Sequence, residues 1–155
     1  MSLSREEVDR LVDEHFGYEA ADDVEGVLAS LTDDVHHHVI PSAFGAQRGK
    51  AGARAFYQAM FSAIAGEGVT PVRRLYGENF CVDEAIWHGR VNDGRAFGLA
   101  GGSGRVDFRI LHIFEFRGSL ISSETVWCDV DAIAGQLGQA PAAASGAPPP
   151  AAAIG

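Results

Sequence analysis

Three consecutive histidines, His36, His37 and His38, are the first residues whose types and spacing suggest chemistry. They lie in the stretch DDVHHHVIP, which reads as a strand that a proline ends. Successive strand residues point to opposite faces of a sheet, so the three imidazoles cannot form one site. Valines two residues to either side accompany His37, which predicts that His37 faces the interior. A bulge before the proline would invert this assignment.

His112 is the one polar residue on the apolar face of a predicted strand over 105–117. A polar side chain without a partner costs a few kcal/mol in apolar surroundings. A three-residue hairpin loop at 117–119 would place His112 opposite Glu124, with the Cβ atoms about 4.5–5.5 Å apart. A two-residue turn would put the two on opposite faces. The pair would join a base that titrates near neutrality to a carboxylate that orients it.

Two further polar residues, His88 and Arg90, alternate with Trp87 and Gly89 on a predicted strand over 80–91. They would either bind a carboxylate or phenolate in a pocket or lie on the convex face. Several aromatic side chains are expected in the core or on a ligand shelf: Tyr76, Phe80, Phe97 and Phe108.

The elements that position these residues follow a simple order. Three helices are predicted first: one opened by the capping box Ser4–Glu7, one opened by Asp22, and one after Gly49, with the histidine strand before the third. Strands are then predicted over 69–76, 80–91, 105–117 and 120–129, before a last helical turn in DAIAGQLG. Helices followed by antiparallel strands predict an α+β domain with helices on one face of a curved sheet.

Composition narrows the class of protein. The chain has 155 residues and a net charge of −9, and residues 1–34 hold eleven acidic against two basic side chains. The absence of a basic stripe argues against nucleic acid and anionic membrane as partners. No apolar run approaches the ~20 residues of a membrane span. The charged start excludes a secretory signal, and the two cysteines are expected to be reduced, both of which favour a cytoplasmic protein. One domain over 1–138 is predicted, followed by a disordered Ala/Pro-rich tail over 139–155.

The stretches LTDDVHHHVIPSAFGAQRGKAGARAFY, GRVDFRILHIFEFRGSLI and ETVWCDVDAIAGQLG resemble SnoaL-like proteins of the nuclear transport factor 2-like superfamily, over residues 5–138. The resemblance implies a cone: a strongly curved antiparallel sheet covered by three N-terminal helices, in a cystatin-like roll. It implies a first strand beside the last one, which would bring His37 near Glu124. It also implies a homodimer through the convex face, where Trp127 is expected. Relatives include polyketide cyclases, ketosteroid isomerases, epoxide hydrolases and non-catalytic binding proteins.

The resemblance carries over residue by residue. Ketosteroid isomerases have a tyrosine on helix one where this chain has His15, and an oxyanion-hole aspartate where it has His112. Their general-base aspartate matches Val39, which argues against steroid isomerisation. Epoxide hydrolases and ester cyclases have an aspartate at Val126, and Glu124 on the same face would replace it.

These residues predict acid–base catalysis by His112, Glu124 and His37, with His15 reaching in from helix one. Like SnoaL-like cyclases, such an enzyme needs neither metal nor cofactor for an enolisation or intramolecular aldol closure of an apolar, oxygenated small molecule. The expected substrate-binding residues are His88, Arg90, Tyr76, Phe108 and Val126.

Three alternatives stay open. The buried pair would be merely structural in a non-catalytic small-molecule-binding protein, or the protein would hydrolyse an epoxide or ester. A metal site from His37, His112 and Glu124 is the third, and no HxxxH spacing supports it. An enzyme should show Glu124 and a histidine exposed to an open cavity, and a sealed pair favours the binding protein.

Overall fold

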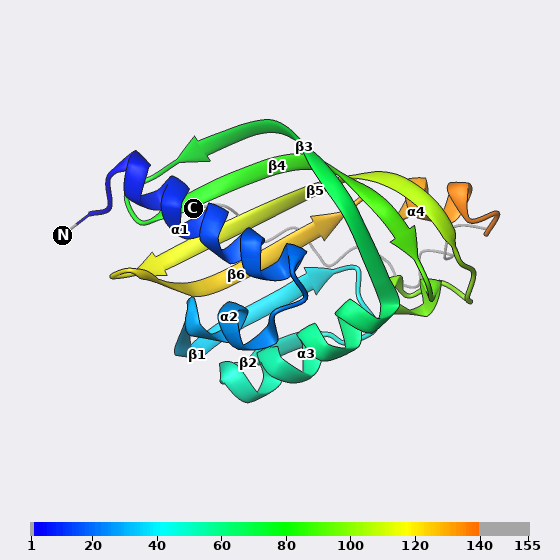
Figure 1. Ribbon diagram of the computed structural model, residues 1–155, viewed down its shortest axis with the longest axis horizontal. Helices are drawn as coiled ribbons and strands as arrows, with labels where there is room; N and C mark the ends of the chain where they lie inside the picture. Colours follow the sequence, from blue (N-terminus) through cyan, green and yellow to red (C-terminus); the bar gives the residue numbers. More distant parts are fainter. Residues whose placement is uncertain (1, 140–155) are drawn as a thin grey trace, which may run out of the picture.

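Four α-helices and six strands follow one another in the computed structural model, which describes residues 2–139 (Figure 1). The elements in chain order are α1 (Arg5–Ala20), α2 (Val24–Ala29), β1 (Leu31–Ile40), β2 (Ala46–Arg48), α3 (Gly49–Ala63), β3 (Ile64–Tyr76), β4 (Phe80–Val91), the 3-10 helix η1 (Gly94–Phe97), β5 (Gly104–Arg117), β6 (Leu120–Cys128) and α4 (Val130–Gln136). The α+β architecture predicted from the sequence is confirmed. The short strand β2 and the helix η1 were not predicted, and the predicted tail lies outside the described residues apart from Gln139.

The six strands form one sheet in the order β2-β1-β6-β5-β4-β3. The chain passes from β1 through α3 to the far edge, and successive hairpins then bring β6 back beside β1. Because the hairpins alternate in direction, β6 arrives parallel to β1, and His37 is paired with Glu124. This ladder confirms that the first and last strands are neighbours, and it is the one parallel pairing in a sheet that is otherwise antiparallel over the described residues.

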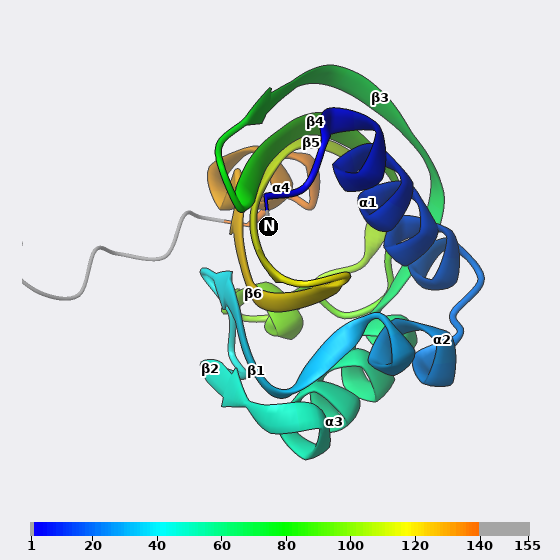
Figure 2. The same cartoon turned by 90° about the vertical axis from the view of Figure 1, so that its left-hand side faces the viewer.

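The sheet curls around its own long axis, and helices lie along the side that it leaves open (Figure 2). Helix α1 begins with the predicted capping box, in which Ser4 and Glu7 bond each other's backbone N–H groups. Its buried residues recur at helical spacing and face the sheet: Val8, Leu11, Val12 and His15. The histidine is therefore placed inside by the same periodicity that buries the apolar residues.

Arg74 of β3 ties α1 to the sheet. Its guanidinium donates to Asp83 of β4 at 2.7 Å and to Asp9 and Asp13 of α1 at 2.7 and 3.0 Å. Asp9 also accepts a hydrogen bond from the Tyr76 hydroxyl at 2.7 Å. Tyr76, predicted to bind substrate, thus uses its hydroxyl to hold α1 in place.

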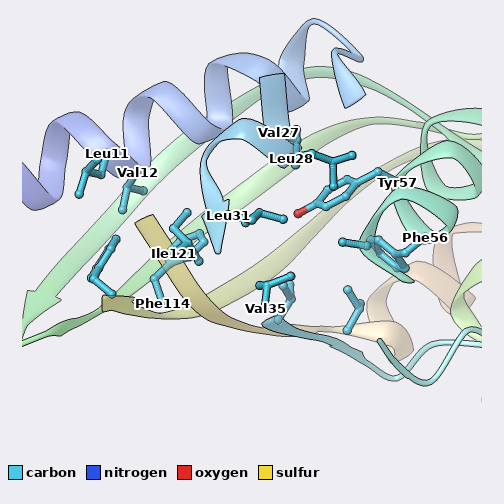
Figure 3. Close-up of a cluster of buried hydrophobic side chains, with 14 of the residues drawn as sticks. Leu11, Val12, Val27, Leu28, Leu31, Val35, Phe56, Tyr57, Phe114 and Ile121 are labelled. Atoms are coloured by element: carbon cyan, nitrogen blue, oxygen red, sulfur yellow. The ribbon is translucent and has the colours of Figure 1, made fainter. Parts of the chain in front are cut away.

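Side chains from three helices and the sheet fill the space under α1, α2 and α3. Figure 3 shows this apolar cluster, which extends from Phe114 of β5 through Leu31 and Val35 to Tyr57 of α3. A second apolar cluster lies toward η1 and α4 and contains Phe97 and Phe108. Phe108 is therefore a core residue. No helix of residues 2–139 has the length and apolar character needed to cross a membrane.

Candidate acid–base site

The carboxylate of Glu124 lies in the interior, where β6 faces the helices, and its residue is 1% exposed. It accepts a hydrogen bond of 2.9 Å from the hydroxyl of Tyr57, a buried residue on the inner side of α3. Two imidazoles approach the same oxygen, Oε2: Nε2 of His15 at 3.4 Å and Nε2 of His37 at 3.6 Å. Three elements of the N-terminal half thus converge on one carboxylate of the last strand. We call these four residues the Glu124 cluster.

His15 is oriented by a second contact on the far side of its ring. Its Nδ1 lies 2.8 Å from the hydroxyl of Ser30, and that hydroxyl donates its own proton to the Val27 carbonyl at 2.6 Å. Since Ser30 has only one proton, His15 must be the donor at Nδ1. Nε2 of His15 therefore faces Glu124 and also Glu19, whose Oε1 lies 3.4 Å away on the same helix.

The charges in this cluster depend on one another. Burial alone would lower the pKa of His15, but the carboxylates of Glu124 and Glu19 outweigh it and raise that pKa to about 10. Burial would likewise raise the pKa of Glu124, but the neighbouring His15 and His37 hold it well below its usual range. In metal-free protein at neutral pH, the two groups therefore form an imidazolium and a carboxylate.

His37 behaves differently although it approaches the same oxygen. It is 1% exposed, packs against Phe56 with ring centroids 4.3 Å apart, and its Nδ1 has no partner among the described residues. Burial lowers the pKa of His37 more than Glu124 raises it, so the ring is neutral at pH 7. A neutral imidazole beside an ionised carboxylate is the arrangement of a general base with its orienting group.

The predicted contact between His112 and Glu124 is wrong, although both face the interior as predicted. His112 is paired with Val126, and Glu124 is paired with Phe114. The hairpin has a two-residue turn at Gly118 and Ser119, which alone would have turned Glu124 outward.

A β-bulge restores the face of Glu124. The register shifts between Phe116, which pairs with Ile121, and Glu115, which pairs with Ser123, so Ser122 is left without a pairing partner. One extra residue in β6 reverses the side-chain alternation. The shorter turn and the bulge each reverse the face on which Glu124 lies, so together they leave its side chain inside.

His112 lies elsewhere on the inner face, among aromatic rings. It stacks on Phe114 with centroids 5.4 Å apart and meets Phe16 of α1 edge-on at 4.9 Å. Its Nδ1 has no hydrogen-bond partner within residues 2–139. Burial lowers its pKa, and Glu124 opposes that shift from a distance.

His88 and Arg90 lie on the convex face, which decides between the two placements that the sequence left open. His88 is bonded on both sides, with Nδ1 2.7 Å from Asp107 and Nε2 2.8 Å from the Thr70 hydroxyl. Arg90 is exposed on the same face. The predicted pocket role of these two residues is therefore wrong. Val126 is buried on the inner face beside the cluster, as predicted.

The Glu124 cluster is sealed from solvent. A surface hollow of about 300 Å³ lies between α3, η1 and the loop after β1, and another of about 200 Å³ lies beside α1. None of the four cluster residues lines either hollow. Two aromatic rings lie between the first hollow and the cluster. Phe44 lines the hollow, and its ring centroid is 5.6 Å from that of Phe56, which in turn packs against His37.

The structure adds three residues that sequence reasoning missed: Tyr57, Glu19 and Ser30. Glu19 follows His15 by four residues, a spacing that places both on one side of a helix. Tyr57 adjoins Phe56 on the inner side of α3, so helical periodicity indicated burial but not a polar contact. Of the possible metal ligands, three bring their atoms within 4.8 Å of one another: His15, Glu19 and Glu124. The predicted metal trio of His37, His112 and Glu124 is not brought together in this way.

Comparison with known proteins identifies the family to which the chain belongs. The sequence profile of the SnoaL-like domain matches residues 9–124, so the protein belongs to the SnoaL-like family. No curated protein matches the chain.

Solved structures of similar fold share little sequence with it. A putative SnoaL-like polyketide cyclase from Shewanella denitrificans superposes with a TM-score of 0.72 at 14% identity, covering 87% of this chain and 98% of its own. An LEH-like epoxide hydrolase from M. tuberculosis gives 0.65 at 21% identity, covering 84% and 89%. A hypothetical protein with a ketosteroid isomerase-like fold from Catenulispora acidiphila, in complex with trimethylamine, gives 0.68 at 14% identity, covering 84% and 93%. At these identities the likeness shows the fold alone.

Proposed function

We propose that this protein is a small-molecule enzyme of the cyclase or isomerase type that uses acid–base catalysis without a cofactor. The observation that carries the proposal is the fully buried Glu124 carboxylate, on which Tyr57, His15 and His37 converge. Relatives of this fold include a putative polyketide cyclase, an epoxide hydrolase and a protein crystallised with a small amine, which supports a small-molecule ligand.

Physical cost supports a functional role for the cluster. Burying ionised groups requires several kcal/mol of desolvation per ion, and apolar side chains of similar volume would fill the same space at no such cost. Buried groups with mutually perturbed pKa values concentrate at functional sites. Most of the other buried residues are apolar, with Thr32, Asp83 and His112 as exceptions, so the cluster stands out as a feature that stability alone does not require.

The geometry suggests a role for each residue. His37 is neutral and packs on Phe56, whose ring contacts Phe44 in the wall of the hollow, so it would accept a proton from carbon next to a substrate carbonyl. Glu124 would stabilise the imidazolium that forms, and His37 would return the proton to complete an enolisation or follow an aldol closure. Tyr57 and His15 would keep Glu124 ionised and in place. His112, another buried polar residue on the inner face, remains the candidate for contacting the substrate oxygen.

Substrate would reach His37 through the hollow of about 300 Å³. Most of its lining is apolar, with Asp93 and Arg95 as an ion pair in its wall. Phe44 and Phe56 stand between this hollow and His37, and rotation of the two rings would be needed to open a path to it. The lining of the hollow favours an apolar molecule with one or two oxygens as the substrate.

Turnover tests the proposal directly. With a panel of apolar enolisable ketones and dicarbonyl compounds, we expect His37→Gln and Glu124→Gln to lower kcat by about 10²–10⁴-fold, the loss typical of a general acid or base. His36→Gln is the matched control, because this neighbouring histidine lies on the outer face. If the wild type turns a substrate over and His37→Gln matches its rate, His37 is not the base.

A second function is favoured by the closure of the site around Glu124. A sealed cluster is what we expect of a binding protein, in which the cone would open to admit a ligand and would not convert it. In that case the wild type binds compounds of the panel without converting them. Glu124→Gln then changes affinity while the compound is recovered intact, as chromatography of the bound fraction would show.

We also propose that the convex face meets a second copy of the chain. Trp127 is 49% exposed there, near the C-terminal end of β6. Replacing Trp127 by lysine should halve the mass measured by light scattering, and a wild type that runs as a monomer would refute the dimer.

A further inference from the structure

We propose that His15, Glu19 and Glu124 form a buried binding site for a divalent transition-metal ion such as Zn²⁺. The ion would take the place between these three groups that a proton on His15 occupies in the metal-free protein. The inference goes beyond the proposed function and requires no turnover. It also predicts that the metal inhibits acid–base catalysis, because it engages the carboxylate that His37 needs.

The distances between the three groups fit a metal site better than direct hydrogen bonds. Nε2 of His15 is 3.4 Å from Oε1 of Glu19 and 3.4 Å from Oε2 of Glu124. Nitrogen and oxygen ligands that each lie about 2.0–2.2 Å from a tetrahedral zinc ion are about 3.4 Å apart. Charge-assisted hydrogen bonds are shorter, at about 2.7–2.9 Å.

A second histidine in the same chain shows the contrast. His88 approaches Asp107 to 2.7 Å on the convex face, the ordinary length for such a pair. Nε2 of His15 instead lies 3.4 Å from each of two carboxylates and forms a short hydrogen bond with neither. The three groups therefore surround a point rather than contact one another.

The hydrogen bond at Nδ1 of His15 also favours metal binding at Nε2. Because Ser30 gives its proton to the Val27 carbonyl, Nδ1 of His15 carries a proton and Nε2 is left to bind a metal. Metal-binding histidines almost always donate their second ring N–H to such an oxygen, which fixes tautomer and ring orientation.

Charge balance favours a dication at this point. Within residues 2–139, neither Glu19 nor Glu124 forms an ion pair with a lysine or an arginine. With a neutral His15 the site carries two negative charges in a largely buried place, which a Zn²⁺ ion would neutralise. A proton on His15 neutralises only one of them.

Polar groups lie around the position of a fourth ligand, and Glu19 connects the site to solvent. The hydroxyl of Tyr57 lies 3.5 Å from Nε2 of His15, and the fully buried ring of His37 points Nε2 toward Glu124, so a metal-bound water would meet polar groups. Three protein ligands plus a water is the usual set at an open zinc site. The Glu19 side chain is 25% exposed, which links the site to solvent.

Metal binding to the full chain tests the proposal. After treatment with a chelator, the wild type should bind one Zn²⁺ per chain in calorimetry, with a raised Tm, and Co²⁺ should give the visible absorption of a tetrahedral ion. Glu19→Gln and Glu124→Gln should each weaken Zn²⁺ binding by more than about 100-fold. Ser30→Ala, which removes only the outer partner, should weaken it by about 10–100-fold.

The histidines of the outer face supply the control. His36 and His38 lie side by side there, with ring centroids 6.5 Å apart, and such a pair can bind metal adventitiously. The double variant H36Q/H38Q should keep the one-equivalent binding. If that variant loses the binding while Glu19→Gln keeps it, or if the wild type binds no Zn²⁺, the inference is wrong. Because Glu19 is partly exposed, its variant should remain folded even if the Glu124 variant does not.

Failure of this inference and failure of the proposed function are distinguishable. Turnover without Zn²⁺ binding would overturn the metal site and leave the enzyme proposal standing. Zn²⁺ binding in a protein that converts no compound of the panel would do the reverse.

Discussion

Replacing Glu124 by alanine is expected to lower the free energy of unfolding by about 3–5 kcal/mol, the usual effect of removing one member of a buried ionic group. The loss would leave the Tyr57 hydroxyl without its acceptor and His15 without a buried counter-charge. Urea unfolding followed by circular dichroism measures the change. Glu115→Ala is the matched control, since this glutamate is exposed on the outer face of β5 and should change the stability by less than about 0.5 kcal/mol.

A combined variant separates stability from function. If the cluster is retained for chemistry, replacing it as a whole by apolar side chains should recover most of the loss. We expect the variant H15L/H37L/Y57F/E124L to be about as stable as the wild type, because none of the four positions then carries a buried polar group. A quadruple variant as unstable as Glu124→Ala would instead assign the cluster a structural role.

The stability of the protein is expected to fall as the pH drops below about 6.5, in part because of His112. Burial lowers the pKa of His112 in the folded state, so the unfolded chain binds this proton at a higher pH than the folded chain does. The folded state therefore loses up to about 1.4 kcal/mol per pH unit between the two pKa values. The charged groups that oppose the shift are Glu124, Glu19 and, across the sheet on β4, Asp83.

His112→Phe isolates this contribution. Phenylalanine keeps the stacking on Phe114 but has no proton to bind, so the variant should show a weaker loss of stability between pH 7.5 and 5. His38→Gln, on the outer face, should follow the wild type. Equal slopes for His112→Phe and the wild type would show that His112 does not titrate in the predicted sense.

Alternation and helical periodicity were enough to predict that three histidines face the interior, but Phe80, expected in the core or on a ligand shelf, is 45% exposed. The valines beside His37 set its face, the apolar residues of β5 set that of His112, and the spacing of α1 set that of His15. These are local rules, and each of the three histidines is buried as expected. The strand order placed His37 beside Glu124 because the family resemblance implied it, and the β1–β6 ladder confirms it.

Contacts between elements could not be predicted in the same way. The pairing of His112 with Glu124 depended on the length of one turn, and the real turn is one residue shorter and followed by a bulge. The hydroxyl of Tyr57 finds Glu124 only once α3 lies across the sheet. Glu19 belongs to the site because the last turn of α1 lies close to Glu124 of β6, an arrangement that the sequence of α1 does not contain.

The unpaired Ser122 has a consequence for how this family could change over time. Deleting this single residue would make the ladder regular, with Ser123 still paired with Glu115 and Glu124 still paired with Phe114. The glutamate would therefore stay on the inner face after the loss of one codon at this point, and no residue of the helices would have to change to keep it there.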